Sequence, residues 1–316
     1  MSEKKVRIVV LGSILYDCVV WADRLPKKGE TVVGYKNGFF CGGKGANQAV
    51  QAAKLGAEVY MISKVGRDNE GQILLNNLKE NGVNTDFIKI EDNCRTDTCC
   101  IHVDKNGDNA IMIATDAGKH IQPEDVLCAE EIFKTADVFL TQLEVNPETV
   151  EFALKLAKKL DKVTILNPAP PRDISVELFK YADYITPNET ESEFFSDIEN
   201  DKDVSTWCDE VGKKLLSLGS KAMVITLGKK GAYFTDGTIC SILPTFDVTP
   251  TDTTAAGDAF NAAFAVKIGE GASIDEALKY ANAAGSLAAS KEGAQSSLAT
   301  REEIEALVKS GKLLDA

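Results

Sequence analysis

The segment Asp252-Thr-Thr-Ala-Ala-Gly-Asp258 is the strongest signal for chemistry in the sequence. Phenylalanines and other apolar residues follow it at four-residue spacing, which predicts a helix over residues 257–269. The small residues Ala255, Ala256 and Gly257 leave the first backbone N–H groups of this helix uncovered. Unpaired N–H groups and the helix dipole both attract anions, so the segment predicts an anion site.

Asp258 would lie inside that positive helix end. A carboxylate beside an anion site suits phosphoryl transfer to a hydroxyl group. The backbone N–H groups stabilise charge on the moving phosphoryl group, and the carboxylate accepts the proton of the alcohol. The alternative is a first-turn aspartate that only stabilises the helix dipole.

A second glycine-rich element is Gly42-Gly-Lys-Gly-Ala-Asn47. Together with Gly38 it approaches a P-loop, but Gly45 stands where the Ser or Thr that holds magnesium is required, so we reject that interpretation. We expect the glycines to let the backbone approach a ligand closely, and Asn47 to offer both a donor and an acceptor. A tight turn before a helix is the alternative. The apolar run at 6–11 is not followed by G-x-G-x-x-G, which argues against a dinucleotide dehydrogenase.

Short β-branched runs alternate with helical patterns along the chain. They predict buried strands at 6–11, 58–63, 138–142, 163–166, 184–186 and 222–227. They predict helices at 46–55, 71–81, 148–160, 205–218, 257–269, 275–291 and 301–309. We therefore expect an α/β fold with an open, mainly parallel sheet flanked by helices on both faces.

Two strand pairs, 14–22 with 31–40 and 97–103 with 109–114, have no crossover helix between their members. They predict a small antiparallel β sheet beside the main one, formed by about residues 13–41 and 96–114, which would serve as a lid or an interface. An ordinary extension of the main sheet is the alternative. We expect residues 1–316 to form a single domain with this lid.

Polar or glycine-rich segments follow several predicted strands: Glu144, Asn167, Asn188 with Glu191, and the turn at 228–231. Ligands of open parallel sheets bind beyond the carboxyl ends of the strands. Oxygen-bearing side chains gathered there suit a magnesium–phosphate site, although turns are commonly polar for other reasons.

The composition excludes several classes of protein. The net charge of −13 disfavours electrostatic binding to nucleic acid or anionic membranes, and no apolar run is long enough to span a bilayer. The sequence has eight cysteines but no C-x-x-C pair, and only two histidines, so we expect no zinc site. We expect a cytoplasmic protein with reduced thiols.

Taken in order, the motifs resemble those of the ribokinase family of carbohydrate and nucleoside kinases, and the resemblance spans nearly the whole chain. The motifs that carry it are Gly12-Ser-Ile14 with Asp17, Gly42–Asn47, Gln142-Leu-Glu144, Asn167-Pro-Ala-Pro170, Thr186–Glu191, Thr226-Leu-Gly228, Asp252–Asp258 and Gly293–Ser297. Within this family the set is most similar to ribokinases. The resemblance implies ATP-dependent phosphorylation of the primary hydroxyl of a pentose, with Mg²⁺ and an activating monovalent cation, usually K⁺.

The resemblance also implies roles for individual residues. Asp258 would be the catalytic base, and Ala255, Ala256 and Gly257 would form the anion hole. The sugar would contact Leu15, Tyr16, Asp17, Gly43, Lys44, Gly45, Ala46, Asn47 and Glu144. ATP would contact Asn188, Thr226, Leu227, Gly228, Lys229, Lys230, Gly231, Gly257 and Asn282, with Glu191 acting on Mg²⁺ indirectly. The monovalent cation would be surrounded by Asp252, Thr254, Ala288, Lys291, Gly293 and Ser297, with Lys291 contributing its backbone carbonyl.

Leu15 departs from the family pattern, in which ribokinases carry Asn two residues before the sugar-binding Asp17. Leucine cannot hydrogen-bond a sugar hydroxyl, and a buried hydroxyl without a partner costs about 1–3 kcal/mol. An apolar residue here is similar to deoxyribokinases. We expect D-ribose as the substrate, giving D-ribose 5-phosphate, with 2-deoxy-D-ribose as a competing possibility.

Other functions stay open from the sequence alone. A related kinase could act on a nucleoside or on fructose, and a sugar sensor without activity could share the fold, although the intact Asp258 argues against a sensor. We expect small-molecule sugar and ATP as partners, with no nucleic acid or membrane. The resemblance also implies a homodimer through the lid, for which Trp21, Tyr35, Phe39 and Phe40 would supply an apolar seam.

Overall fold

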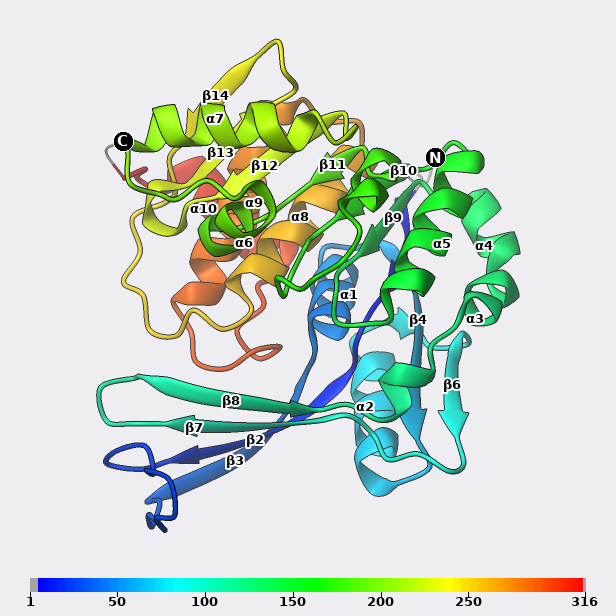
Figure 1. Ribbon diagram of the computed structural model, residues 1–316, viewed down its shortest axis with the longest axis vertical. Helices are drawn as coiled ribbons and strands as arrows, with labels where there is room; N and C mark the ends of the chain where they lie inside the picture. Colours follow the sequence, from blue (N-terminus) through cyan, green and yellow to red (C-terminus); the bar gives the residue numbers. More distant parts are fainter. Residues whose placement is uncertain (1–4, 315–316) are drawn as a thin grey trace.

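The computed structural model of the protein describes residues 5–314 and contains a ten-stranded sheet and a four-stranded sheet (Figure 1). Across the large sheet the strands lie in the order β14 (Cys240–Leu243), β13 (Ala232–Thr235), β12 (Ala222–Thr226), β11 (Tyr184–Ile185), β10 (Val163–Leu166), β9 (Val138–Thr141), β1 (Arg7–Leu11), β4 (Glu58–Gly66) and β5 (Val83–Asn84), and β6 (Ile88–Glu91) pairs with the end of β4.

The strands from β12 to β5 are parallel to their neighbours, whereas β13 and β14 pair antiparallel at one edge. The predicted α/β class and its six buried strands are confirmed, with ends that differ by a few residues. β13 and β14 were not predicted, because their short runs lie within a polar, turn-rich stretch. The chain moves from β1 to β4 on one side and to β9 on the other, so the sheet reverses its winding between β1 and β9.

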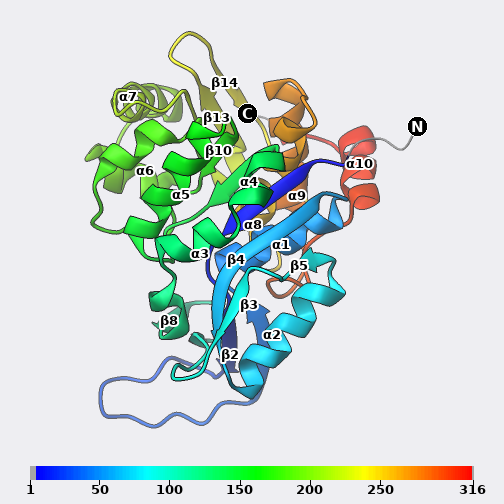
Figure 2. The ribbon, with the colours of Figure 1, turned by 90° about the vertical axis from the view of Figure 1, so that its right-hand side faces the viewer.

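Helices cover both faces of the large sheet (Figure 2). On one face lie α1 (Lys44–Lys54), α2 (Asn69–Glu80), α8 (Ala256–Gly269), α9 (Ile274–Ala289) and α10 (Arg301–Ser310). On the other lie α3 (Pro123–Cys128), α4 (Glu130–Thr135), α5 (Pro147–Lys159), α6 (Glu189–Ser196) and α7 (Val204–Leu216). Alternate strand residues enter the two apolar cores: Ile8 and Val10 face α1 and α8, whereas Val9 and Leu11 face the other layer.

The short helices α3, α4 and α6 were not predicted, and neither were the 3₁₀ turns η1 (Ala117–His120), η2 (Val176–Tyr181) and η3 (Gly228–Lys230). Elements of one or two turns carry too few apolar positions to show a period in the sequence.

The four-stranded sheet, called the small sheet below, projects from one end of the molecule (Figure 1). Its strands lie in the order β3 (Lys36–Gly42), β2 (Leu15–Trp21), β7 (Thr98–Val103) and β8 (Asn109–Ala114). Each predicted pair is an antiparallel hairpin, and the two hairpins join through the parallel pair β2–β7.

The predicted strand over 31–40 is wrong at its start. Strand β3 begins only at Lys36, and the chain between Trp21 and Lys36 forms a long loop that extends from the body (Figure 2). Val33 is 88% exposed in this loop, so its β-branched side chain has no surface on which to pack. The sequence pattern shows that a side chain is β-branched, but it does not show whether a partner strand lies beside it.

The described part of the chain contains no helix long and apolar enough to cross a membrane. All eight cysteines are free thiols.

Candidate active site

Asp258 is buried in the first turn of α8, directly beside an open helix end. Ala255 precedes the helix in the left-handed conformation, with φ 60° and ψ 6°, and no side chain caps the helix. A Cβ atom added to Gly257 would meet nothing within 4 Å, so the backbone there faces open space. The N–H groups of the first turn have no carbonyl partners within the helix, and that of Ala256 donates to Thr253 O, before the helix, at 3.2 Å. The start of α8 thus has the open form that the predicted anion site requires.

Two amide side chains of α1 hold the Asp258 carboxylate. Asn47 Nδ2 donates to Oδ2 at 2.9 Å, and Gln48 Nε2 donates to Oδ1 at 3.0 Å. Burial raises the pKa of Asp258, while the charge of Lys44 and these two hydrogen bonds oppose that rise. A carboxylate with a raised pKa is a stronger base, and the two donors fix its orientation. The arrangement suits the removal of a proton from an alcohol.

Gln48 is a site residue that the sequence reasoning missed. It is fully buried, donates to Asn167 Oδ1 at 3.2 Å as well as to Asp258, and accepts a hydrogen bond from Gln142. The network links α1 to the ends of β9 and β10. A signal was available, because Gln48 is a polar residue that directly follows the predicted site residue Asn47 on a helix rich in alanine.

The glycines before and within α1 lie close to other chain segments, a role that adds to the expected approach of a ligand. A Cβ atom on Gly45 would lie 2.6 Å from the backbone of Gly12, and one on Gly42 would lie 2.1 Å from the Asp17 carboxylate. Gly43 has φ +92° and would crowd the backbone of Leu15. The loop after β1 thus packs directly against the start of α1, where the fully buried Ala46 donates its N–H to Ser13 O.

Glu144 lies beside the start of α1, where the sheet reverses its winding. Its carboxylate accepts hydrogen bonds from Ser13 Oγ and from the backbone N–H of Lys44, the latter at 3.0 Å. Burial alone would lower the pKa of Lys44, but the charges of Asp258, Glu144 and Glu191 outweigh burial and raise it. Lys44 therefore carries its positive charge among three carboxylates.

Asp17 and Leu15 lie on the same face of β2, and both are buried. Burial, with a contribution from the charge of Glu144, raises the pKa of Asp17 to about 7. Tyr16 alternates to the opposite face, where its ring stacks on Phe39 at 5.7 Å between centroids. The structure therefore brings Asp17 and Leu15 together but turns the Tyr16 side chain away from them.

Asn188 and Glu191 form a capping box at the start of α6. Asn188 Oδ1 accepts from Glu191 N at 2.8 Å, and Glu191 Oε2 accepts from Asn188 N at 2.8 Å. Burial raises the pKa of Glu191 to about 7, against the lowering effects of the Asn188 backbone and Lys44. Because its carboxylate is already bonded to the helix cap, Glu191 fits an indirect role at Mg²⁺ better than direct ligation.

The segment Thr226–Gly231 leaves the end of β12 through the exposed turn η3. Leu227 is buried, and a Cβ atom on Gly228 would meet nothing within 4 Å. Asn282, on α9, is buried and donates to the carbonyls of Leu243 and Pro244 at 3.1 and 3.3 Å. Its amide nitrogen thus holds the chain that leaves β14.

Three of the predicted cation-site residues are directly linked. The Asp252 carboxylate accepts hydrogen bonds from Thr254 N, Thr254 Oγ1 and Gly293 N, the last at 2.9 Å. The Lys291 ammonium bonds Glu303 at 2.8 Å, which leaves its backbone as the part that can face a cation. The remaining members lie on the same two segments: Ala288 near the end of α9 and Ser297 beyond Gly293. These oxygen donors fit a hard monovalent cation.

Known proteins are similar to this chain over nearly its whole length. The family model described as pfkB family carbohydrate kinase matches residues 5–301. Ribokinase of Bacillus subtilis is 42% identical over 301 residues, which cover 95% of this chain and 99% of that protein. Deoxyribokinase of Salmonella typhimurium is 34% identical over 297 residues, which cover 94% of this chain and 96% of that protein.

A solved structure described as Arabidopsis thaliana ribokinase complexed with ribose and ATP superposes with a TM-score of 0.89 at 31% identity. The match covers 97% of this chain and 99% of that one. The family match spans nearly all of the sequence, and the relatives are covered over nearly their full length. The chain therefore belongs to the pfkB family of carbohydrate kinases.

Proposed function

We propose that the protein transfers the γ-phosphoryl group of ATP to the 5-hydroxyl of D-ribose, giving D-ribose 5-phosphate and ADP. The observation that carries this proposal is the Asp258 carboxylate, held by Asn47 and Gln48 beside the uncapped N-terminus of α8. The ribokinases among the relatives, at up to 42% identity, support ribose as the acceptor.

In this mechanism Asp258 takes the proton of the 5-hydroxyl as the sugar oxygen attacks the γ-phosphorus and the bond to the β-phosphate oxygen breaks. Within the predicted anion hole of Ala255–Gly257, the N–H group of Gly257 faces open space and would stabilise the negative charge on the transferred group, whereas that of Ala256 already donates to Thr253 O. Lys44 adds a positive charge. Removal of a general base costs typically ~10²–10⁴-fold in rate.

The sugar would lie between the small sheet and α1. Asp17 and Glu144 offer carboxylate acceptors to its hydroxyls. Among the described residues Asn47 Oδ1 has no hydrogen-bond donor although it is buried, so a sugar hydroxyl there would remove an unpaired polar atom. We assign about residues 13–41 and 96–114, which include nearly all of the small sheet, as a lid on the single domain of residues 1–316. Its closure would exclude water, which competes with the sugar for the phosphoryl group.

We assign the nucleotide to Thr226–Gly231, Asn188 and Asn282, with Mg²⁺ near Glu191 through water. Mg²⁺, when bound, offsets the charge of the phosphates. We assign K⁺ to the loop pair joined by Asp252 and Gly293, next to the start of α8. The oxygen ligand atoms in that loop pair fit such a cation. Because the loop pair lies next to the start of α8, a cation there would help to order the anion site.

We also propose a homodimer formed through the small sheet, in the cytoplasm, where ATP and reduced thiols occur together. Tyr35 and Phe39 are 62% and 60% exposed, whereas Trp21 and Phe40 are half-buried and pack edge to face on each other. The apolar seam therefore differs from the expected one. Strand β8 adds the exposed Met112, which the strand register places on the same face of the small sheet as Phe39.

The second candidate substrate is 2-deoxy-D-ribose. Buried Leu15 lies on the face of Asp17 and offers no hydrogen bond, and a deoxyribokinase is among the relatives. An apolar side chain would accept the missing hydroxyl of the deoxy sugar without leaving a polar group unpaired.

Coupled measurement of ADP release tests the proposal with D-ribose, 2-deoxy-D-ribose, D-fructose and adenosine, in Mg²⁺ with and without K⁺. We expect the highest kcat/KM with D-ribose and a marked gain from K⁺. A preference for adenosine or fructose, or no ADP release with any acceptor, would contradict the ribose assignment.

A further inference from the structure

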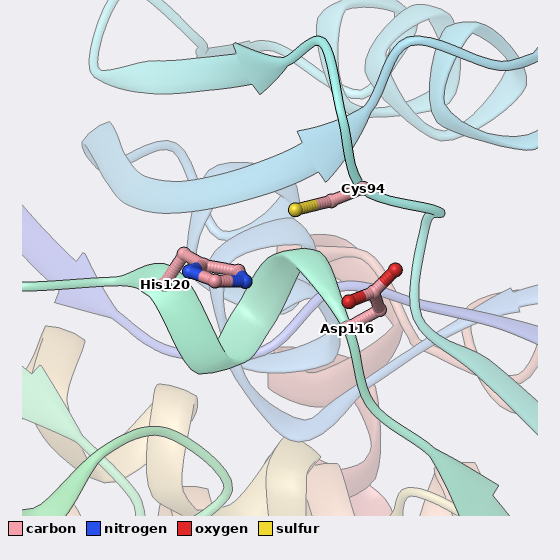
Figure 3. Close-up of side chains that lie close together, drawn as sticks. All are labelled: Cys94, Asp116 and His120. Atoms are coloured by element: carbon pink, nitrogen blue, oxygen red, sulfur yellow. The ribbon is translucent and has the colours of Figure 1, made fainter.

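Cys94, Asp116 and His120 come together at the root of the small sheet (Figure 3). Within residues 5–314 they are the one group of three metal-ligating side chains whose donor atoms all lie within 4.8 Å of one another. We propose that these three residues bind a divalent transition-metal ion, best matched by Zn²⁺, and that the ion clasps the two chain segments that lead into and out of the small sheet.

The donor set selects the kind of ion. A thiolate, an imidazole and a carboxylate are each common zinc ligands, whereas Mg²⁺ and Ca²⁺ take oxygen ligands. Zinc bond lengths place tetrahedral ligand atoms roughly 3.3–3.8 Å apart. Side-chain rotations that move the ligand atoms by about 1 Å would therefore complete the site. Three protein ligands leave the fourth position to water, and the exposed His120 keeps the ion in reach of solvent.

The backbone around the three residues is already held in place. Arg95 N donates to Asp116 Oδ2 at 2.8 Å, and Ala117 N donates to Arg95 O at 3.1 Å. The buried carboxylate of Asp97 accepts from the N–H groups of Asp116 and Gly118 at 2.7 and 3.1 Å. Pre-ordered ligand positions lower the conformational cost of binding.

Charge also favours a cation at this place. Besides Asp116 the groups acting on the Cys94 thiol are Glu91 and Asp97, with Lys64 opposing them. Lys64 is itself paired with Glu91 at 2.8 Å and with Asp125 at 3.2 Å, so its charge is largely offset.

The position in the fold defines what the ion would do. Cys94 lies between β6 and β7, whereas Asp116 and His120 lie between β8 and α3, so an ion joins the entrance of the β7–β8 hairpin to its exit. The expectation of no zinc rested on the lack of a C-x-x-C pair and on the presence of only two histidines, whereas the ligands of this site come from two separate segments.

The test is zinc binding to the metal-free full chain, without nucleotide, by competition with a chromophoric chelator. We expect one zinc per wild-type chain and a loss of affinity of at least ~10-fold in both Cys94→Ser and His120→Gln. The chain offers matched controls in His102→Gln, the only other histidine, and Cys100→Ser, an exposed free thiol, and both variants should bind zinc as the wild type does. Absence of wild-type binding, unchanged affinity in both ligand variants, or an equal loss in His102→Gln would overturn the site.

Two further readouts keep the result independent of folding and of kinase activity. Cobalt bound to the wild type should show a thiolate charge-transfer band that Cys94→Ser lacks. If Cys94→Ser fails to fold, His120→Gln carries the test, because its side chain is exposed. Zinc should also slow hydrogen exchange of the amides at 94–98 and 114–120 in the wild type. Unchanged exchange in the presence of bound zinc would overturn the clasp.

Discussion

Asn47 Nδ2 donates a 2.9 Å hydrogen bond to Asp258 Oδ2 across 211 positions of sequence. The bond joins the first turn of α1 to the first turn of α8, so the N-termini of the two helices meet at one carboxylate. The other side-chain atom of Asn47, the buried Oδ1, has no donor within the described residues. Asn47 therefore orients Asp258 with one atom and can accept a sugar hydroxyl with the other.

Asn47→Ala should weaken D-ribose binding by about 1–3 kcal/mol, or roughly 5–150-fold, because a sugar hydroxyl loses its acceptor. Turnover should fall as well, since Asp258 loses one of its two orienting donors. Calorimetric titration of ribose and steady-state kinetics measure the two effects. The control is Gln51→Ala, which removes a buried amide from the same helix that bonds Ala299 O instead. Equal ribose affinity in wild type and Asn47→Ala would exclude the contact.

Ribose binding should weaken as the pH falls from 8 to 6. The Asp17 carboxyl has its pKa raised to about 7, so below that pH the free protein carries a proton that sugar binding must displace. The fraction ionised predicts a roughly tenfold weaker apparent affinity at pH 6 than at pH 8. Titration calorimetry without nucleotide measures it, and Asp17→Asn should give a weak, nearly flat profile. A flat wild-type profile would refute the role of Asp17.

The same shift has an effect on stability. The folded pKa of Asp17 lies above its ordinary value of 3.8, so its stabilising contribution is present at low pH and is lost as the pH rises through about 7. Relative to wild type, Asp17→Asn should gain thermal stability at pH 8 and lose that advantage near pH 4. Melting curves of both proteins at these pH values test the sign.

Leu15→Asn should move specificity toward D-ribose. The added amide can bond the 2-hydroxyl, which the deoxy sugar lacks, and such a bond is worth about 1–3 kcal/mol, or roughly 5–150-fold. The readout is the ratio of kcat/KM for ribose to that for 2-deoxyribose. Leu15→Met, which stays apolar, is the control and should leave the ratio near its wild-type value. An unchanged ratio in Leu15→Asn would place Leu15 outside the sugar site.

Met112→Glu should convert the proposed homodimer to a monomer. Met112 is 69% exposed on β8, on the face of the small sheet that carries Phe39, and a buried, unpaired charge at an interface is costly. Light scattering at micromolar protein measures the mass. Ile239→Glu is the control, because Ile239 is 61% exposed at the turn before β14 and lies outside the small sheet. A monomeric wild type would contradict the dimer.

Most of the fold could be predicted from the sequence, because parallel strands buried on both faces and amphipathic helices have clear patterns of apolar residues. Val9 and Val10 point into opposite cores, so their strand forms a continuous apolar run in the sequence and could be predicted. The start of β3 could not be predicted, because strand pairing depends on a neighbour that the local pattern does not show. The exposed Val33 illustrates this limit.

The site was predictable where backbone chemistry is local, as in the small residues before Asp258. It was less so where side chains meet across the fold. Gln48 acquires its role only through contact with Asp258 and Asn167. The glycine at position 45 reflects the close approach of Gly12, which no local pattern could indicate.

Turnover of Asp258→Asn tests the central claim most directly. Asn has the same shape and can still accept a hydrogen bond from α1, but it cannot take the sugar proton. We expect kcat to fall ~10²–10⁴-fold while ribose and ATP dissociation constants stay within a few fold of wild type. The control is Asp275→Asn, which removes a first-turn acid from α9 and should cost a little stability without loss of turnover. Near-normal turnover in Asp258→Asn would show that Asp258 only stabilises its helix and would contradict the account.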